Sequence, residues 1–372
     1  METAVAPLPD HDGWMLYGAT GYTGVLLAEE AKRRGLRPLL AGRSEAKLKP
    51  LAERLGMPFR AVGLDDPAAL RGALQGVRAV LHAAGPFVDT AAPMVRACLD
   101  AKAHYLDITG ERSVFQRVLG TDAEAKARGV CLVSGVGFDV VPSDCLAKHV
   151  ADRVSGGARE LEIALAMLGR PSAGTFKSLF GFLPEGTWVR RGGQLQKLAF
   201  GRGVRRVRFS QREGWAMPMS LGDLETAWRT TGAPDITVLL AIPSGLARAL
   251  RAAWPAAAAG MAVCRPLLAS SRFQSMARRW TERNIQGPDD SSRARTRTFV
   301  WARARSASGD ERQAWLECPD GYDFTAHSAL NATLSLLERA APGATTPALA
   351  FGADFPLTVP GVRRLDTLPG PP

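Results

Sequence analysis

Residues 14–24 read WMLYGATGYTG, and this stretch decides the fold class. The apolar run at 14–17 predicts a short buried strand, and residues 22–34 predict a helix. Three glycines occupy the turn between them. Such a turn lets backbone N–H groups approach a pyrophosphate, which the helix N-terminus also attracts. An ordinary turn is the alternative, but we predict a dinucleotide site whose contacts include Gly18, Ala19, Thr20, Gly21, Tyr22, Thr23 and Gly24.

The end of the next strand indicates which dinucleotide is bound. The stretch LRPLLAGRS at 36–44 brings Arg43 and Ser44 to a position roughly 20 residues past the last glycine. An NAD-binding chain usually carries Asp or Glu there, to accept a hydrogen bond from the ribose 2′-hydroxyl. Arginine instead pairs with a 2′-phosphate, and serine can donate to it. The residues therefore favour NADP(H), unless Arg43 is simply a solvated loop residue.

Composition restricts the class of protein. The chain has 372 residues, 46% of them apolar, which suffices for two globular domains. Its five cysteines form no CxxC pair, which argues against a disulfide framework and against structural zinc. We therefore expect no metal and a cytoplasmic location. Residues 1–13 lack the basic start and apolar core of a secretory signal, so we expect a flexible tail at 1–12.

The net charge of +11 suits acidic partners such as phosphorylated cofactors, acidic carrier proteins or anionic membrane surfaces. The basic residues are scattered and no nucleic-acid-binding motif is present. We therefore expect no nucleic acid partner.

Residues 13–150 predict a Rossmann domain, because strand-like and helix-like runs alternate with short connections. Six strands in this rhythm suit the order 3-2-1-4-5-6 of a doubly wound parallel sheet. Residues 151–324 change rhythm and predict a second α+β domain for substrate binding or oligomerisation, built on a mostly antiparallel sheet. A helix at 324–340 is expected to bring the segment 325–360 back onto the first domain. The expected elements of the second domain are strands at 158–168, 193–200, 204–210, 293–305 and 312–319 and a helix at 174–183.

Several motifs together resemble the saccharopine dehydrogenase-like oxidoreductases, and most of all their trans-acting enoyl reductase branch. These motifs are YGATGYTG at 17–24, LAGRSEAKL at 40–48, AAGPF at 83–87, CLDAKAHYLDITGE at 98–111, GVGFDVVPSD at 135–144 and TTPALAFGADF at 345–355. The resemblance is dense over the Rossmann part and patchy beyond it. It implies an NADP-type Rossmann domain, an inserted α+β domain and reduction of a polarised double bond. That bond is C=N in saccharopine-type members and C=C on a polyketide or lipid chain in the enoyl reductase branch.

Three later strand ends should meet at the same edge of the sheet as the glycine-rich turn. They extend the predicted cofactor site to Ala84, Gly85, Pro86, Phe87, Gly110, Gly137 and Phe138. We expect the nicotinamide ring near Phe87, Gly110, Gly137 and Phe138.

The reacting groups are less clear from sequence. None of the four tyrosines is followed by lysine four positions later, which excludes the short-chain dehydrogenase mechanism, and HExxH, P-loop and nucleophile-elbow motifs are absent. The candidate proton donors are Tyr105, Asp107, Asp139 and Ser143, with a positioned water as the alternative. Asp107 and Asp139 could instead anchor their loops, and Asp144 could simply favour the dipole of the following helix.

Two segments of the second domain bear on the substrate. Residues 293–305 alternate arginine and aromatic residues with small ones, which predicts either a solvated sheet face or a basic face for an anionic partner or a second subunit. The apolar segment 236–269 contains Leu246 and Leu250 on one expected helix face, and its uncharged run at 252–264 falls short of the ~20 residues that span a bilayer. It predicts either a core helix or a mobile apolar flap that rests on lipid or covers an acyl chain.

The sequence therefore supports three hypotheses. The first is an NADPH-dependent reductase of a C=C bond on a lipid or polyketide-type substrate, presented by an acidic acyl carrier protein or an anionic membrane. The second is a dehydrogenase or reductase acting on the C=N bond of an amino acid or amine. The third is an NADP-binding scaffold without turnover. A homodimer and peripheral membrane association are compatible with each of them.

Overall fold

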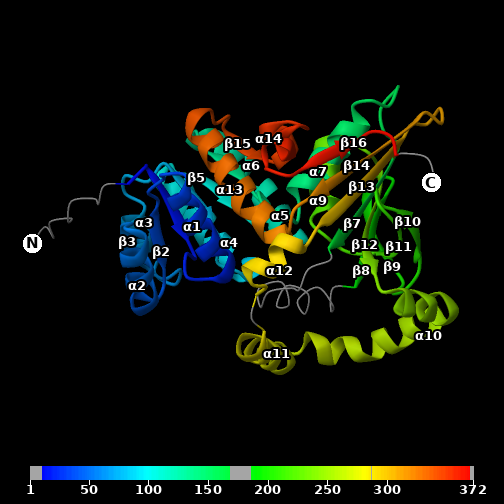
Figure 1. Cartoon of the computed structure of the whole chain (residues 1–372), viewed down its shortest axis with the longest axis horizontal. Coiled ribbons are helices and arrows are strands. Elements are labelled where there is room, and N and C mark those ends of the chain that lie inside the picture. The colour runs from blue at the N-terminus through cyan, green and yellow to red at the C-terminus, as the bar shows by residue number, and fades with distance from the viewer. Residues whose placement is uncertain (1–10, 168–185, 286, 369–372) are drawn as a thin grey trace, which may run out of the picture.

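A computed structural model describes residues 11–167, 186–285 and 287–368. Figure 1 shows two sheets lying on opposite sides of a central group of helices, with the N-terminal part of the chain in the first sheet. Most of the predicted tail and the predicted helix at 174–183 lie outside the described residues.

The first sheet has seven parallel strands in the order β15-β6-β5-β4-β1-β2-β3. The predicted order 3-2-1-4-5-6 is confirmed, and β15 adds a further strand beside β6. The strands are β1 (Trp14–Tyr17), β2 (Leu39–Gly42), β3 (Phe59–Ala61), β4 (Ala79–His82), β5 (His104–Asp107), β6 (Cys131–Val133) and β15 (Gly343–Thr345).

Helices cover both faces of this sheet because most of its strands are apolar on both sides. On one face, Leu16 and Leu81 pack in the same core as α1 (Tyr22–Arg33), α2 (Glu45–Leu55) and α13 (Gly321–Glu338). On the other, Met15 and Val80 pack with α3 (Pro67–Ala73), α4 (Phe87–Ala101) and α5 (Arg112–Leu119). The helix predicted at 112–128 is two helices, since α5 ends at Leu119 and α6 spans Asp122–Arg128.

The second sheet is mixed, and the prediction of a mostly antiparallel sheet is confirmed. Its main path runs β10-β11-β12-β7-β13-β14-β16, and only the pairing of β12 with β7 is parallel among the described strands. A hairpin of β8 and β9 joins the edge of β12. The strands are β7 (Glu160–Met167), β8 (Thr187–Arg191), β9 (Gln194–Leu198), β10 (Arg205–Arg208), β11 (Glu213–Pro218), β12 (Asp235–Ile242), β13 (Thr298–Arg305), β14 (Glu311–Cys318) and β16 (Arg363–Leu365).

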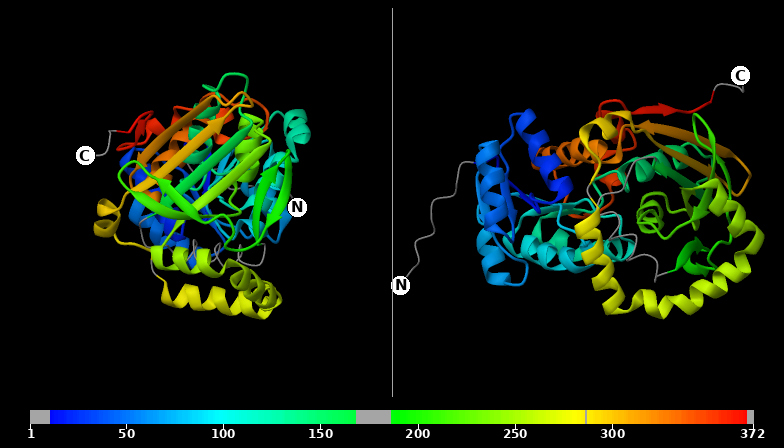
Figure 2. Two further views of the ribbon diagram at one scale, coloured as in Figure 1. Left: turned by 90° about the vertical axis from the view of Figure 1, so that its right-hand side faces the viewer. Right: turned by 60° about the horizontal axis from the view of Figure 1, so that its bottom comes forward.

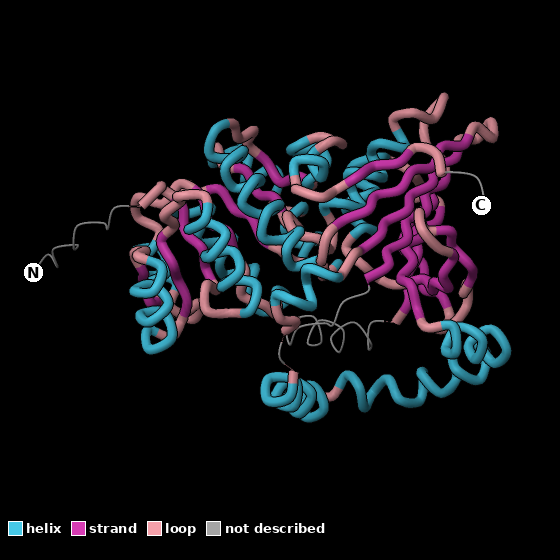
Figure 3. Tube along the Cα trace, in the orientation of Figure 1, coloured by secondary structure: helices cyan, strands magenta, loops and turns pink. Residues whose placement is uncertain are grey.

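The helix α7 (Val141–Ala151) joins the two halves of the molecule. Ten of its eleven residues are buried. It lies against the second sheet together with α9 (Asp223–Thr231), as Figure 3 shows. One apolar core therefore runs from Leu81 in the first sheet through Leu146 to Val300 in the second. The C-terminal segments α14 (Pro347–Phe351) and η2 (Phe355–Thr358) also contact α7.

The prediction of an exposed basic strand at 293–305 is wrong in two respects: the strand starts later, and its aromatic residues are buried. Residues 290–295 form a short helix, α12 (Asp290–Arg295), and the strand begins at Thr298. Phe299 and Trp301 are buried in a small apolar cluster with Val207 and Phe209 of the β10 region. Arg303 is paired with Glu162 and Glu311. This face of the sheet is therefore largely packed and neutralised.

The segment after β12 forms two long helices outside the body, α10 (Ser244–Ala269) and α11 (Ser271–Asn284). We call them the arm. Figure 2 shows the arm running beside the two sheets, from the end of the second sheet back toward the first. The backbone is non-helical at Ala253, which bends α10. Leu246 is exposed whereas Leu250 is buried against Gly201, so the two leucines do not share one exposed face.

Candidate active site at the carboxyl edge of the first sheet

The glycine-rich turn packs too closely for any side chain. A Cβ atom at Gly18 would lie 2.7 Å from the Ala84 nitrogen, and one at Gly24 would lie 2.1 Å from the Gly18 carbonyl oxygen. Gly18 also has a φ of 87°, in the left-handed region that glycine tolerates. The helix α1 that follows has no side-chain N-cap and no acidic residue in its first turn. Its N-terminal N–H groups are therefore available to an anion such as a pyrophosphate.

Arg43 and Ser44 lie at the end of β2, next to this turn in the sheet order. Arg43 is exposed, and its guanidinium makes no hydrogen bond or ion pair within the parts of the chain that the structure describes. Ser44 begins α2 without a side-chain cap. Both side chains are thus free to receive the 2′-phosphate of a bound NADP(H).

A buried histidine, His82, supports the loop after β4 through the hydroxyl of Thr90. The Thr90 hydroxyl donates to the carbonyls of Ala84 (2.6 Å) and Pro86 (3.0 Å), so its oxygen accepts from His82 Nε2 at 3.1 Å. Burial lowers the pKa of His82 to about 3, and its Nδ1 has no partner in the described residues. His82 is therefore a neutral support of the Ala84–Phe87 loop, a role that the sequence pattern did not reveal.

Glu111 fixes the start of α4. Its two carboxylate oxygens accept from the N–H groups of Phe87 (3.3 Å) and Val88 (2.6 Å). The N-terminus of α4 therefore already binds an anionic side chain of this protein. The Phe87 ring itself is nearly buried.

Tyr105 and Asp107 form a buried network beneath the loops after β5 and β6. Asp107 accepts hydrogen bonds from Tyr105 (2.8 Å), Ser134 (2.9 Å) and the backbone N–H groups of Thr109 (3.0 Å) and Gly135 (2.8 Å). Both residues are 0% exposed, and burial raises both pKa values. Of the two roles considered for Asp107, these contacts support the loop anchor. Tyr105 orients Asp107 and has no open path to a substrate.

Asp139 occupies a different position on the loop after β6. The residue is exposed, and its carboxylate lies beside Gly110, where a Cβ atom would be 3.0 Å from Oδ2. The surrounding protein removes enough water to raise the pKa of this carboxyl to about 6. A carboxyl group that is reachable from solvent and protonated in part near neutral pH suits proton transfer.

The neighbouring Gly137 and Phe138 are turned toward α13. A Cβ atom at Gly137 would lie 3.0 Å from Thr325, and the Phe138 N–H donates to the Thr325 hydroxyl at 3.0 Å. The Phe138 ring meets Phe324 edge to face, with 5.7 Å between ring centroids. These contacts position the loop, and whether the nicotinamide also reaches it stays a prediction.

Two further carboxyl groups are buried behind Asp139. Asp144 accepts from the Thr230 hydroxyl (2.8 Å) and the Ala348 N–H (2.9 Å), so it ties α7 to α9 and α14. Asp223 at the start of α9 is 0% exposed, and neither of its oxygens has a hydrogen-bond partner among the described residues. Burial raises the pKa of Asp144 to about 6 and that of Asp223 to about 7, with the nearby Asp144 and Asp139 adding to the second shift.

Ser143 lies between these carboxyl groups and is fully buried. Its hydroxyl donates to the Val140 carbonyl at 3.0 Å, and its proximity also lowers the Asp223 pKa, against the larger effect of burial. Sequence reasoning missed Asp223, because a carboxylate after Gly222 resembles any first-turn acid of a helix.

Tyr22 of the glycine-rich turn contacts the end of the arm. Its hydroxyl donates to the Pro288 carbonyl (2.6 Å) and accepts from Arg293 (3.1 Å), and burial raises its pKa to about 12. A Cβ atom at Gly287 would lie 2.2 Å from its ring. The Tyr22 side chain thus joins the phosphate-binding turn to the segment after α11.

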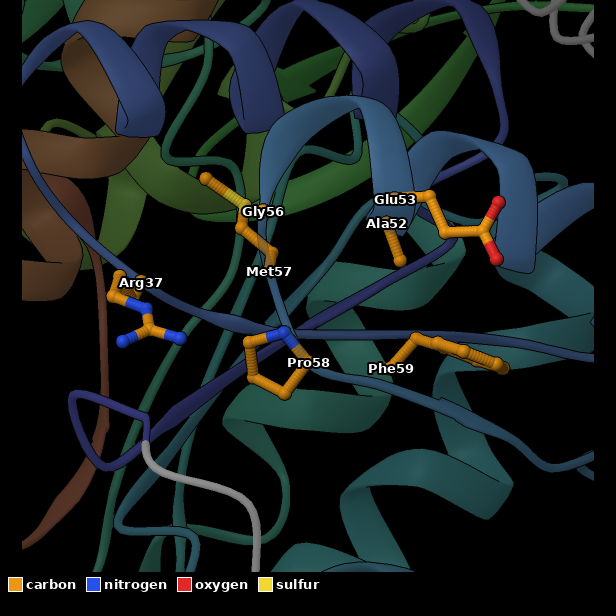
Figure 4. A pocket seen from close by; sticks show the side chains of 7 residues that line it. All are labelled: Arg37, Ala52, Glu53, Gly56, Met57, Pro58 and Phe59. Atoms are coloured by element: carbon orange, nitrogen blue, oxygen red, sulfur yellow. The ribbon is translucent and has the colours of Figure 1, made fainter.

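A surface hollow elsewhere in the domain is not part of this site. Figure 4 shows that Arg37, Met57, Pro58 and Phe59 line it together with the end of α2. Arg37 and Pro58 precede β2 and β3, so the hollow lies at the amino edge of the parallel strands. Ligands of open parallel sheets bind at the opposite, carboxyl edge.

Comparison with known proteins agrees with this geometry. Residues 14–133 match the family described as saccharopine dehydrogenase NADP binding domain. A trans-acting enoyl reductase of Mycobacterium ulcerans is 31% identical over 149 residues, which cover 38% of this chain and 36% of the relative. The human saccharopine dehydrogenase-like oxidoreductase is 28% identical over 194 residues, covering 45% of each chain.

The similarity in fold extends further than the similarity in sequence. The apo saccharopine dehydrogenase (L-Glu forming) of Saccharomyces cerevisiae superposes with a TM-score of 0.62 at 12% identity, over 95% of this chain and 99% of that one. The sequence matches span less than half the length of the curated relatives named above. The predicted cofactor class, NADP(H), is confirmed for the N-terminal domain. Residues 14–133 therefore match the saccharopine dehydrogenase NADP-binding domain, and the fold of the chain is similar to that of saccharopine dehydrogenase.

Proposed function

We propose that the protein is an NADPH-dependent reductase of a polarised double bond, with the C=C bond of a lipid or polyketide-type acyl chain as its first candidate. The observation that carries this proposal is the position of Asp139. Among the carboxyl groups of the loops after β5 and β6 and the start of α9, Asp139 alone is exposed. Because its pKa is raised to about 6, part of the Asp139 population carries a proton near neutral pH and can donate it when a hydride is transferred.

Bound NADPH would supply a hydride from its nicotinamide ring, and the protein does the rest. The N-terminus of α1 would hold the pyrophosphate, and Arg43 and Ser44 would hold the 2′-phosphate. Asp139 would donate its proton to the carbon next to the carbonyl of the substrate, as the partner of a hydride delivered to the far carbon of the double bond. Asp139 would then regain a proton from water, since the residue lies at the surface. The products are the saturated chain and NADP⁺.

Reduction of C=N on an amino acid is the second candidate, and the fold shared with saccharopine dehydrogenase keeps it open. A substrate of that kind needs cations for its carboxylates. Two arginines near the start of α9 are already committed, since Arg190 (2.8 Å) and Arg112 (3.6 Å) both pair with Glu225. The described part of this region therefore favours a less acidic substrate. An NADP-binding scaffold without turnover is the third candidate.

The test follows NADPH oxidation with a panel of enoyl thioesters of increasing chain length and a panel of cyclic and amino-acid-derived imines. NADPH deuterated at the transferred position labels the product, and mass spectrometry locates the label. We expect deuterium on the carbon far from the carbonyl of an enoyl substrate. Label found only in amines supports the second candidate. Tight NADPH binding with no oxidation by either panel or by a cell extract supports the scaffold.

A further inference from the structure

The arm exposes an unusual amount of apolar surface. The helix α10 is long and apolar enough to cross a membrane by length and composition, and none of its most apolar 18-residue window is buried. Of the ten large hydrophobic side chains exposed in the described residues, six lie in the arm: Leu246, Trp254, Val263, Leu267, Met276 and Trp280. Val263 is 80% exposed and Leu267 is 64% exposed. A surface of this kind marks an interaction site.

The charge of the arm indicates the chemistry of the partner. Residues 244–284 contain seven arginines and one acidic residue, Glu282. On α11, Arg272, Arg279 and Arg283 line a shallow groove beside Met276 and Trp280. Aromatic and apolar side chains alternating with arginines suit the boundary between acyl chains and anionic headgroups.

The connections of the arm exclude a helix that crosses the bilayer once. The arm leaves the body at β12 and returns to it where Pro288 contacts Tyr22. If α10 crossed, α11 would have to cross back. With 14 residues α11 extends only about 21 Å, short of the ~30 Å hydrocarbon core, and it is rich in arginine. A membrane partner would therefore have to receive both helices in the plane of its surface.

We propose that the arm is a peripheral membrane anchor that docks on bilayers containing anionic lipid. Val263, Leu267 and the alanine-rich part of α10 enter the acyl boundary. Arg279 and Arg283 of α11 extend their stems along that boundary and place their guanidinium groups on lipid phosphates. The bend at Ala253 lets the second part of α10 lie flat while its first turns stay on the body through Ala247 and Leu250. This inference is independent of the substrate proposed above.

The test is flotation of the purified full-length protein with vesicles of phosphatidylcholine alone or mixed in equal parts with phosphatidylglycerol. We expect binding to the mixed vesicles that weakens with salt. The variant Val263→Glu with Leu267→Glu should lose it, because two carboxylates then enter the acyl boundary. The matched control is Leu349→Glu with Leu357→Glu, which alters two exposed leucines outside the arm and should bind like the wild type.

A second variant separates charge from apolar contact. Arg279→Ala with Arg283→Ala should weaken binding to the mixed vesicles roughly tenfold or more, because each arginine near an anionic surface contributes on the order of 1 kcal/mol. Circular dichroism shows whether each variant is folded.

A second copy of the chain is the competing occupant. The mass of the lipid-free protein is therefore measured for the wild type and for Val263→Glu with Leu267→Glu. A dimer that this variant splits, in a protein that ignores both vesicles, overturns the proposal. Wild-type protein that fails to float with anionic vesicles at low salt overturns it as well.

Discussion

The side chains at the carboxyl edge of the first sheet are packed and hydrogen-bonded within the protein, whereas many side chains of the arm are apolar and exposed. At the carboxyl edge, Asp107 alone accepts four hydrogen bonds, and glycines stand where a Cβ atom would collide with backbone. Along the arm, apolar side chains meet water, and a Cβ atom at Gly260 would touch nothing. The first region is specified by internal contacts and holds a small ligand. The second leaves apolar side chains exposed, and this exposure is the reason why we propose a partner outside the chain.

Replacing Asp139 should give the largest effect, a loss of kcat that no substitution in the arm should reproduce. Loss of a general acid typically costs 10²–10⁴-fold in rate, so Asp139→Asn should lower kcat by about that factor with little change in NADPH affinity. The wild-type rate should fall as the pH rises through about 6, since the protonated form is the active one. The variant should lose this pH dependence. An unchanged pH profile would assign proton transfer to water.

Substitution of Arg43 should weaken only NADPH binding, and substitution of the arm arginines should weaken only vesicle binding. Arg43→Ala should weaken NADPH binding by roughly 1.5–3 kcal/mol, the value of a charge-assisted contact, while NADH binding stays the same. Arg279→Ala with Arg283→Ala should leave both affinities unchanged and affect vesicle binding only. Calorimetric titration of both nucleotides measures this. Equal NADPH affinity for wild type and Arg43→Ala would remove Arg43 from the cofactor site.

Replacing glycine with alanine should destabilise the protein at the carboxyl edge of the first sheet and stabilise it in the arm. At position 24 alanine would place its Cβ atom 2.1 Å from the Gly18 carbonyl oxygen. Gly24→Ala should therefore destabilise the protein by ~1–3 kcal/mol or more and weaken NADPH binding. Gly260→Ala within α10 should stabilise by about 0.5–1 kcal/mol, because it only removes backbone freedom. Urea unfolding compares the two. A neutral Gly24→Ala would show that the turn relaxes easily.

Asp223 should give a modest effect on stability that depends on pH. Burial raises its pKa to about 7, so the folded state binds a proton that the unfolded state releases above pH ~4. Stability should therefore fall as the pH rises from about 4 to about 7. Asp223→Asn should remove this loss and be more stable than wild type at pH 8, by about 1–2 kcal/mol. In the matched variant Asp144→Asn, an NH2 group replaces one of the two oxygens that accept from Thr230 and Ala348 and cannot accept in its place, so this variant should be less stable. Destabilisation of Asp223→Asn at every pH would reveal a partner for its carboxylate.

The sequence predicts the first region far better than the second because local rules act there. The turn at Gly18, the strand end at Arg43 and the sheet order all follow from short-range patterns. The hydrogen bonds of Glu111 to the start of α4 and the neighbours of Asp223 depend on segments far apart in the chain, which no local pattern encodes.

The second region illustrates a different limit. Alternation at 293–305 predicted a strand throughout, but the N-cap bonds of Asp289 hold 290–295 as a helix, and Val207 covers the aromatic residues. The apolar character of 236–269 was evident from composition. That this segment forms two helices outside the body, tied to Tyr22 at its far end, required the tertiary structure.

The strand β15 has a consequence for biosynthesis. It pairs Gly343 with Cys131 and Thr345 with Val133, so the last strand of the first sheet comes from a distant part of the chain. At ~5–20 residues per second, the ribosome needs on the order of 10–40 s to make the roughly 200 residues between the two strands. During that time β6 is an open sheet edge with no neighbour on its outer side, which is the kind of edge on which chaperones and aggregation act. Ribosome pausing ahead of residue 343 should therefore reduce the yield of folded protein more than pausing after it.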